Sequence, residues 1–281
     1  MICIKTVGQL ISDDDLEYVY RECVNSKFIC TNTMYSDKMS KTEFVADIGD
    51  STVNAYAGPR PGGYKVTLLG GLVNWAGHFG FIKTLHDMGM PLGKVVKLAE
   101  WTRVFYMTTD MHQDEMTENI TTEMIGKVKM DFAKYRVGSS GFDERWRSNT
   151  LDIVMACVAH EIGHICLGHA DDPGYDGTVM SSNRNIERQA DLFSCSIIQC
   201  GTGVATKGVG VLMLLTSLYC FSPDYDGSST HPATSERVEN MITSFRGVVS
   251  ASDVEMVRKM VDAIAKAKKP KMPNPKKPKG K

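Results

Sequence analysis

The feature that most constrains how this chain folds is an HExxH sequence, His160-Glu-Ile-Gly-His164, placed inside an apolar segment. Apolar residues recur at helical spacing from Leu151 to Leu167, after the polar residues 148–150, and Gly168 suits the end of a helix. Two residues four apart lie on one face of a helix, one turn from each other. We therefore predict a helix on which both imidazoles point at one place.

Two imidazoles in this arrangement are typical of a zinc site, in which the metal binds two ring nitrogens. Glu161, next to the first histidine, can then reach a water at the metal and accept its proton. The alternative is that His160 and His164 are core histidines whose polar atoms are satisfied by neighbours. The helical context favours zinc.

A catalytic zinc usually has three protein ligands and one position open to water. The metzincin extension HExxHxxGxxH is absent, because Leu167 and Ala170 stand at its glycine and third-histidine positions. Glu187 and Asp191 lie four residues apart downstream, so one carboxylate can bind metal while the other orients a ligand. His169 is a rival third nitrogen.

These two carboxylates fall on a second predicted helix, from about Asn183 to Cys200, which ends before Gly201. The competing interpretation is a solvated helix face on which Glu187 pairs with a neighbouring arginine, Arg184 or Arg188. The spacing alone does not decide between a ligand and an ion pair.

Three blocks of the sequence, taken in order, resemble a known family. They are HEIGH at 160–164, Glu187-Arg-Gln-Ala-Asp191, and Thr230-His-Pro-Ala-Thr-Ser-Glu-Arg237. Together they resemble the Glu-zincin peptidases of the HtpX and CAAX prenyl protease type, whose pattern is HExxH, then ExxAD, then an HP segment followed by arginine. The segment Val53 to Leu72 is similar to that family's edge strand and the stretch before its active-site helix.

The resemblance implies a role for each matched residue of the first two blocks. Zinc would be bound by His160, His164 and Glu187. Glu161 would be the general base, and Asp191 would orient a ligand from behind.

The third block carries two further implied roles. His231 would stabilise the oxyanion that forms at the substrate carbonyl, and Arg237 would hold the carboxylate-bearing helix in place or contact the site. The plainer alternatives are that His231-Pro232 simply starts a helix and that Arg237 forms a surface ion pair.

Most members of that family carry transmembrane helices beside the catalytic core. The longest apolar stretch here, Gly208 to Phe221, is shorter than the ~20 residues that a bilayer span needs. We interpret it as a core helix, with a membrane-embedded hairpin as the alternative. The layout also resembles that of phage-exclusion peptidases of the Lit type, which are HExxH proteins without obvious spans.

Two β-branched and aromatic runs, Thr52 to Ala57 and Tyr64 to Leu69, flank a turn at Gly58 to Gly63 and predict adjacent strands. We expect the second strand to be an exposed edge that pairs with an extended peptide substrate. The residues of that edge are Tyr64, Lys65, Val66 and Thr67. The predicted fold class is α+β, a mostly helical zincin-like fold with a small N-terminal sheet whose edge strand borders the active-site cleft.

The rest of the chain is predicted to be mostly helical. Residues 80–136 are expected to be helical with a break near 89–91, and residues 137–149 are expected to form a Gly/Ser-rich loop. Pro232 is expected to open a helix that ends near Gly247, and Ser252 to cap the last one.

We predict a single metallopeptidase-like domain over residues 1–265, with an N-terminal part at 1–149 and a helical zinc-binding half at 150–265. The tail, 266–281, holds eight lysines, four prolines and no acid, so it should be extended and disordered. Because the whole chain has a formal net charge of −1, the rest of it carries −9. The tail is expected to be a solubilising end; the alternative is contact with nucleic acid, anionic lipid or an acidic partner.

Composition places the chain among folded proteins of a reducing compartment. Over 281 residues, 42% hydrophobic and 23% charged content excludes a disordered chain or a multi-span membrane protein. The eight cysteines are dilute, and those in apolar helical segments should be buried thiols. These are Cys157, Cys166, Cys195 and Cys200. The N-terminus lacks a signal-peptide pattern, so we expect a cytoplasmic location.

The function predicted from these features is that of a soluble zinc-dependent endopeptidase, which hydrolyses peptide bonds in a protein or peptide through a zinc-activated water with Glu161 as general base. The alternative is a zinc-stabilised, catalytically silent protein-binding or regulatory module. The presence of Glu161 argues against that alternative, because a purely structural zinc site needs no general base.

Overall fold

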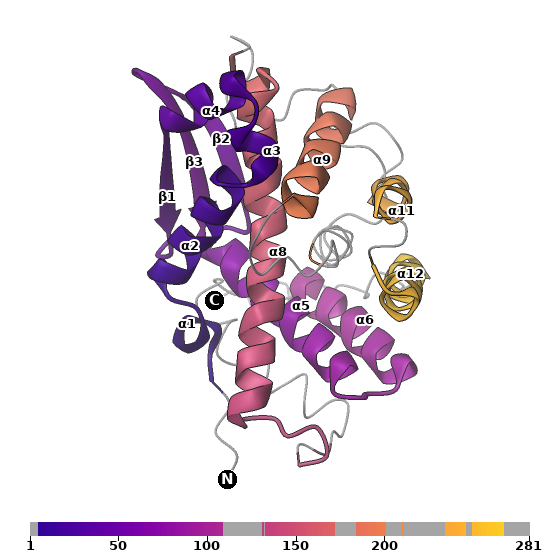
Figure 1. Cartoon of the computed structure of the whole chain (residues 1–281). Coiled ribbons are helices and arrows are strands. Elements are labelled where there is room, and N and C mark those ends of the chain that lie inside the picture. The colour runs from indigo at the N-terminus through magenta and orange to yellow at the C-terminus, as the bar shows by residue number, and fades with distance from the viewer. Residues whose placement is uncertain are drawn as a thin grey trace, which may run out of the picture.

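A computed structural model of the chain describes residues 5–108, 131, 133–171, 184–200, 210, 234–245 and 249–266. One small sheet lies among many helices, which confirms the predicted α+β class (Figure 1). The strands are β1 (Thr42–Asp47), β2 (Ala55–Arg60) and β3 (Gly63–Leu69). The helices are α1 (Val7–Leu10), α2 (Asp13–Val24), α3 (Lys27–Cys30), α4 (Thr33–Ser40), α5 (Gly70–Asp87), α6 (Leu92–Thr108), α8 (Ser140–Cys166), α9 (Arg184–Gln199), α11 (Thr234–Ser244) and α12 (Ala251–Lys266), with a 3-10 turn η1 (His169–Asp171).

The longest of these helices, α8, runs through the middle of the molecule and carries HExxH near its C-terminal end (Figure 1). The side chain of Ser139 caps its start by accepting a hydrogen bond from the Phe142 N–H, and Gly168 follows its end with a φ of +82°. The prediction of a loop at 137–149 is therefore wrong from Ser140 onward, where the helix begins. The glycines and serines there mark a helix start, because Phe142 and Trp146, one turn apart, are fully buried.

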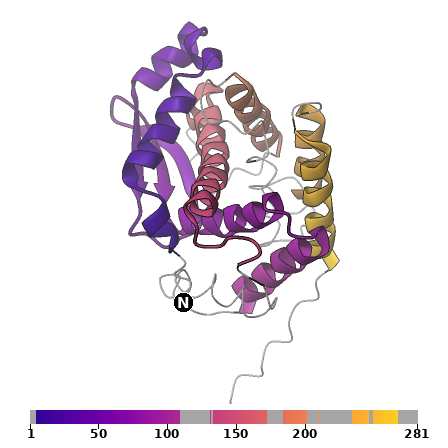
Figure 2. The same cartoon turned by 60° about the horizontal axis from the view of Figure 1, so that its bottom comes forward.

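Helix α8 is enclosed by other elements along its length. α5 and α9 pack against it, and α2 and the sheet lie on its other side (Figure 2). Its contact with α5 is close: a Cβ added to Gly80 would lie 2.5 Å from the Thr150 hydroxyl, and Trp146 Nε1 donates to the Gly77 carbonyl at 2.7 Å. The chain runs through residues 149 and 150 without a break in this helix.

The sheet has the order β1-β3-β2, with β3 parallel to β1 and antiparallel to β2. The two predicted strands are present and adjacent, but β1 was not predicted. Because β1 pairs with β3 along residues 42–47, the prediction that Tyr64, Lys65, Val66 and Thr67 form an exposed edge is wrong. They lie in the central strand, and the edges of the sheet are β1 and β2.

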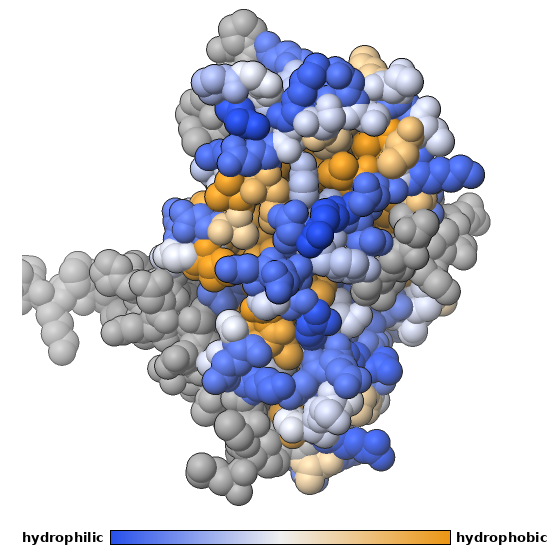
Figure 3. All heavy atoms as spheres, turned by 60° about the vertical axis from the view of Figure 1, so that its left-hand side comes forward, coloured by the Kyte–Doolittle hydropathy of each residue, from blue (hydrophilic) through white to orange (hydrophobic). Residues whose placement is uncertain are grey.

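The two edges of the sheet differ in their surroundings. β1 exposes the acids Glu43 and Asp47, and charged side chains discourage the addition of another strand. On that side of the molecule hydrophilic side chains are interspersed with smaller hydrophobic areas (Figure 3). β2 instead lies beside α8 and η1, which places it next to HExxH.

Several other predictions can be compared with the described residues. No helix of the described residues is long and apolar enough to cross a membrane. The last helix is capped by Ser250, two residues before the predicted Ser252. Cys157, Cys166 and Cys195 are buried thiols, whereas Cys200 is an exposed one. The predicted apolar helix at 208–221, residues 231 and 232, and the tail lie outside the described residues, except Gly210 and Lys266.

Candidate metal centre

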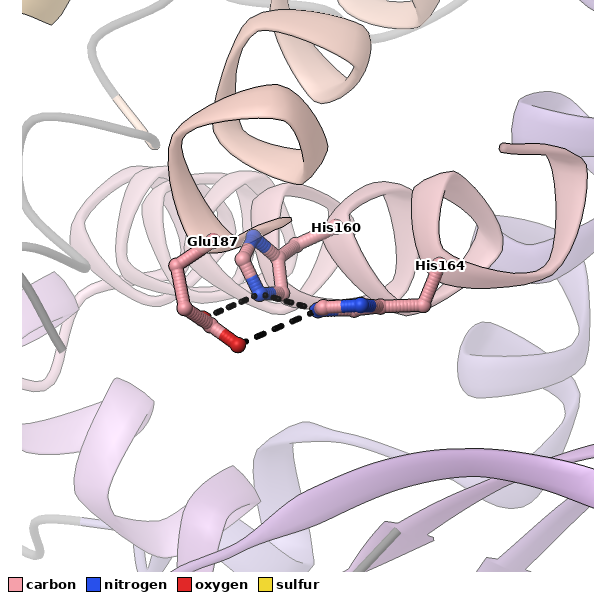
Figure 4. A group of neighbouring side chains, drawn as sticks. All are labelled: His160, His164 and Glu187. Atoms are coloured by element: carbon pink, nitrogen blue, oxygen red, sulfur yellow. Dashed lines mark hydrogen bonds and ion pairs between the residues drawn. The ribbon is translucent and has the colours of Figure 1, made fainter. Parts of the chain in front are cut away.

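Three side chains from two helices converge at one point. His160 and His164 project from α8, and the carboxylate of Glu187 reaches toward them from the first turn of α9 (Figure 4). The two Nε2 atoms are 3.1 Å apart, and the Glu187 oxygens lie 3.3 Å from His160 Nε2 and 3.6 Å from His164 Nε2. Glu187 is only 4% exposed, so it does not lie on a solvated helix face.

These separations fit a tetrahedral metal site. With bonds of about 2.0–2.1 Å from zinc to nitrogen or oxygen, two ligand atoms of a tetrahedron lie about 3.3 Å apart. The observed separations of 3.1, 3.3 and 3.6 Å are close to that value, with Glu187 contacting His160 through Oε2 and His164 through Oε1. Two imidazoles and one carboxylate are also a donor set found at catalytic zinc, where a fourth position stays open. The residues present therefore fit zinc.

The surroundings of the two imidazoles shift their pKa values in opposite directions. Burial opposes a charge on His160, but its contacts with Asp191 and Glu187 outweigh burial and raise its pKa to about 10. Burial and the neighbouring His160 lower the pKa of His164 to about 3. The two Nε2 atoms are 3.1 Å apart, so they can share a hydrogen bond when one of the two nitrogens carries a proton.

Behind His160 lies a buried ion pair. Its Nδ1 is 3.0 Å from Asp191 Oδ1, and Arg237 of α11 donates two hydrogen bonds to the Asp191 carboxylate, at 2.7 and 2.6 Å. Burial would raise the pKa of Asp191, but Arg237 and His160 together lower it to about 2. The charged carboxylate holds the His160 ring through Nδ1 and leaves Nε2 directed at the site.

Behind His164 the partner is another histidine. His169 Nδ1 is 3.1 Å from His164 Nδ1, and His169 Nε2 is 3.1 Å from the Gln189 side-chain oxygen. The His169 ring thus contacts the far side of His164, away from the Nε2 atom that faces Glu187. His169 is not a member of the group of possible ligands, so the structure brings Glu187, rather than this rival nitrogen, to the third position.

Glu161 turns toward the sheet. It is 7% exposed, and burial raises its pKa to about 7, although the charge of His160 and a backbone hydrogen bond from Ala57 of β2 act in the opposite direction. A carboxyl group with a pKa near neutral can both accept and return a proton. Glu161 therefore has the environment of a general base beside the ligand pair.

Tyr64 lies elsewhere than predicted. Its hydroxyl donates to Asp171 at 2.6 Å, which helps to raise its pKa to about 12. Lys38 donates to the other Asp171 oxygen at 2.8 Å and to the Ile165 carbonyl at 2.9 Å. These contacts fasten the end of α8 and η1 to α4 and β3, so the Tyr64 hydroxyl serves the scaffold.

Several residues that contribute to this centre were not predicted from the sequence. Ala57 and Lys38 act through contacts between segments far apart in the chain, for which no local pattern exists. Gln189 lies inside the ExxAD block at a position where the pattern is silent. His231 lies outside the described residues.

Close approach of α8 and α9 brings the donors together. A Cβ added to Gly163 would lie 3.2 Å from the Ala190 carbonyl oxygen and 3.3 Å from the Phe193 Cβ. Small residues face each other where the two helices approach: Gly163 of HExxH on α8 and Ala190 of ExxAD on α9. The distance from Glu187 to the histidines therefore depends on them.

Replacing Gly163 with valine should push α9 away from α8. We expect a loss of about 1–3 kcal/mol in the free energy of unfolding from overpacking, and zinc affinity at least about tenfold weaker because Glu187 moves with α9. Thermal unfolding and chelator competition measure the two effects. Gly141→Val, in the first turn of the same helix with open space around it, is the matched control. Equal zinc affinity in both variants would contradict this explanation.

Part of the chain matches a known protein family. The chain is similar to the Peptidase U49 family over residues 151–258, a range that contains the part of α8 with HExxH, the whole of α9, and Arg237. This similarity supports a peptidase. No curated protein and no solved structure matches the chain.

Proposed function

We propose that this protein is a zinc-dependent endopeptidase of the Glu-zincin kind. The observation that carries the proposal is the convergence of His160, His164 and Glu187 at tetrahedral ligand separations, with Glu161 beside them. The similarity to a peptidase family over the same residues supports it independently.

The chemistry divides between the metal and the chain. When bound by this set, zinc polarises a peptide carbonyl and lowers the pKa of a water toward ~7. His160, His164 and Glu187 hold it, and Asp191 with Arg237 keeps the His160 ring in place. The role of these residues is therefore to hold the zinc and fix its position.

Glu161 moves the proton in this proposal. Its carboxylate accepts a proton from the attacking water and then delivers that proton to the leaving amine nitrogen. Glu161 is then a carboxylate again. Burial raises the pKa of Glu161, and the positive charge of a bound zinc would act in the opposite direction. His231 as a stabiliser of the oxyanion is proposed from the family resemblance alone.

The substrate in this proposal is an extended peptide that lies along β2 instead of β3. Within the described part of the chain, no strand pairs with the outer edge of β2. The Ala57 N–H on that edge points to Glu161 and so toward the reacting groups. Backbone hydrogen bonds along an edge strand select extended peptides over small amides.

Removal and restoration of zinc tests the proposal. The purified protein should contain about one zinc per chain. Incubated with a cell lysate, the loaded protein should generate new protein N-termini that a chelator abolishes and added zinc restores, as measured by mass spectrometry of termini. If zinc binds but loaded and stripped protein give the same termini, the centre stabilises a catalytically silent binding module instead.

A further inference from the structure

The two histidines of the centre are supported by chemically different partners. His160 contacts a carboxylate, that of Asp191, whereas His164 contacts another imidazole, that of His169. The Nε2 atom of His169 in turn contacts the side-chain oxygen of Gln189. A ligand histidine usually donates its second N–H to a carboxylate, a backbone carbonyl or water. An imidazole as the partner of a ligand histidine is unusual. It restricts which nitrogens of His164 and His169 can carry a proton.

The proton positions follow from the requirement that His164 binds metal through Nε2. That atom must then be unprotonated, so His164 carries its proton on Nδ1 and donates it to His169 Nδ1, 3.1 Å away. His169 must in turn carry its own proton on Nε2 and donate it to the Gln189 oxygen, also at 3.1 Å. The opposite direction would place a proton on His164 Nε2 and block the metal.

We propose that His169 is a positioning residue that fixes the tautomer and the ring orientation of His164, and that Gln189 sets the direction of this hydrogen-bond relay. The inference rests on the proposed metal site and adds a role to a residue that was a candidate ligand. In this arrangement the His169 Nδ1 lone pair accepts from His164, so it is not available to a metal.

The backbone around His169 is built to hold the ring there. Gly168 turns the chain with a φ of +82°, and a side chain would be strained in that conformation. Asp171, two residues on, is fastened by Lys38 and Tyr64. His169 is 9% exposed, whereas Gln189, at the outer end of the relay, is an exposed residue.

Gln189 connects the relay to the other half of the centre. It belongs to α9, which also carries Glu187 and Asp191, so one helix supplies the third ligand and the outer supports of both histidines. The relay through His169 adds no net charge behind His164. The negative charge of Asp191 is offset by Arg237, and Glu187 remains the anionic member of the ligand set.

Two substitutions at His169 separate positioning from ligation and from folding. His169→Phe keeps a planar ring but removes the acceptor, and zinc affinity should fall about 10- to 100-fold. His169→Asn offers an oxygen near the Nδ1 position and should restore most of that affinity. Gln189→Leu removes the terminal acceptor and should weaken zinc in the same direction. His86→Asn, on α5 and outside the centre, is the control for loss of a histidine.

Zinc dissociation constants from chelator competition, X-ray absorption of the bound zinc and thermal unfolding are the readouts. X-ray absorption of the wild-type protein should count two imidazoles. The relay is overturned if X-ray absorption counts three imidazoles, or if His169→Phe binds zinc as tightly as the wild type. It is also overturned if His169→Asn binds zinc as weakly as His169→Phe. If His169→Phe does not fold, His169→Asn and Gln189→Leu decide it by the same criteria. A wild-type protein that binds no zinc would overturn the proposed function as well, whereas a wild-type protein that binds zinc isolates the failure to the relay.

Discussion

Replacing Glu161 with glutamine is expected to reduce peptide-bond cleavage by about 10²–10⁴-fold while zinc stays bound. Glutamine has nearly the same size but cannot accept a proton from water at neutral pH. Glu161 is not among the three donors that converge at the centre, so the substitution leaves the metal's ligands intact. Cleavage rates on a substrate found by mapping new termini, together with zinc content, measure the two expectations.

The matched control is Glu144→Gln, an exposed acid in the first turns of the same helix. It makes the same chemical change on α8, far along the helix from the metal ligands, and should cleave at the wild-type rate. If Glu161→Gln cleaves as fast as this control, Glu161 is not the general base. If Glu161→Gln loses zinc, the effect is on metal binding and the assignment of its role is wrong.

Arg237→Met is expected to lower the free energy of unfolding by about 3–5 kcal/mol. Arg237 is 6% exposed and Asp191 is 3% exposed, so removal of the guanidinium leaves a carboxylate buried without its main partner. Removing one partner of a buried ion pair lowers the free energy of unfolding by more than the intact pair contributes to it. The reason is that the remaining charge stays buried away from water. Denaturant unfolding of the wild type and the variant measures the loss.

The chain offers a control with the same bonding at the surface. Arg258 of α12 donates two hydrogen bonds to Glu239 of α11, at 2.9 and 2.8 Å, and both side chains are about half exposed. Arg258→Met should cost less than about 1 kcal/mol. The double substitution Asp191→Asn with Arg237→Met should recover part of the lost stability, because no charge is then buried alone. Equal losses in Arg237→Met and Arg258→Met would show that burial does not govern this pair.

The part of the centre that lies on one helix follows from sequence spacing. His160 and His164 face one point because they are four residues apart, and Glu187 and Asp191 share a face of α9 for the same reason. The resemblance to Glu-zincins then pairs the two helices. Both inferences need only local geometry and the order of the blocks.

What could not be predicted depends on contacts between distant segments. The strand at residues 42–47 has no stronger strand pattern than its surroundings. Its pairing with β3 is what makes β3, rather than β1, the central strand. Likewise, the partner of Tyr64 is 107 residues away in the chain. The start of α8 was missed because a serine cap preceded by glycine resembles a loop until the buried Phe142 and Trp146 are taken into account.

The continuity of α8 has a consequence for how the chain tolerates insertions. This helix of 27 residues, about 40 Å long at 1.5 Å per residue, fits Trp146 into the core at one end and presents His160 and His164 at the other. One inserted residue anywhere between Trp146 and His160 would rotate one end by about 100° relative to the other. The histidines would then face away from α9, or Trp146 would face away from α5. The number of residues between Trp146 and His160 is therefore fixed by the directions in which the two ends of α8 must face. The surface loops are under no such constraint.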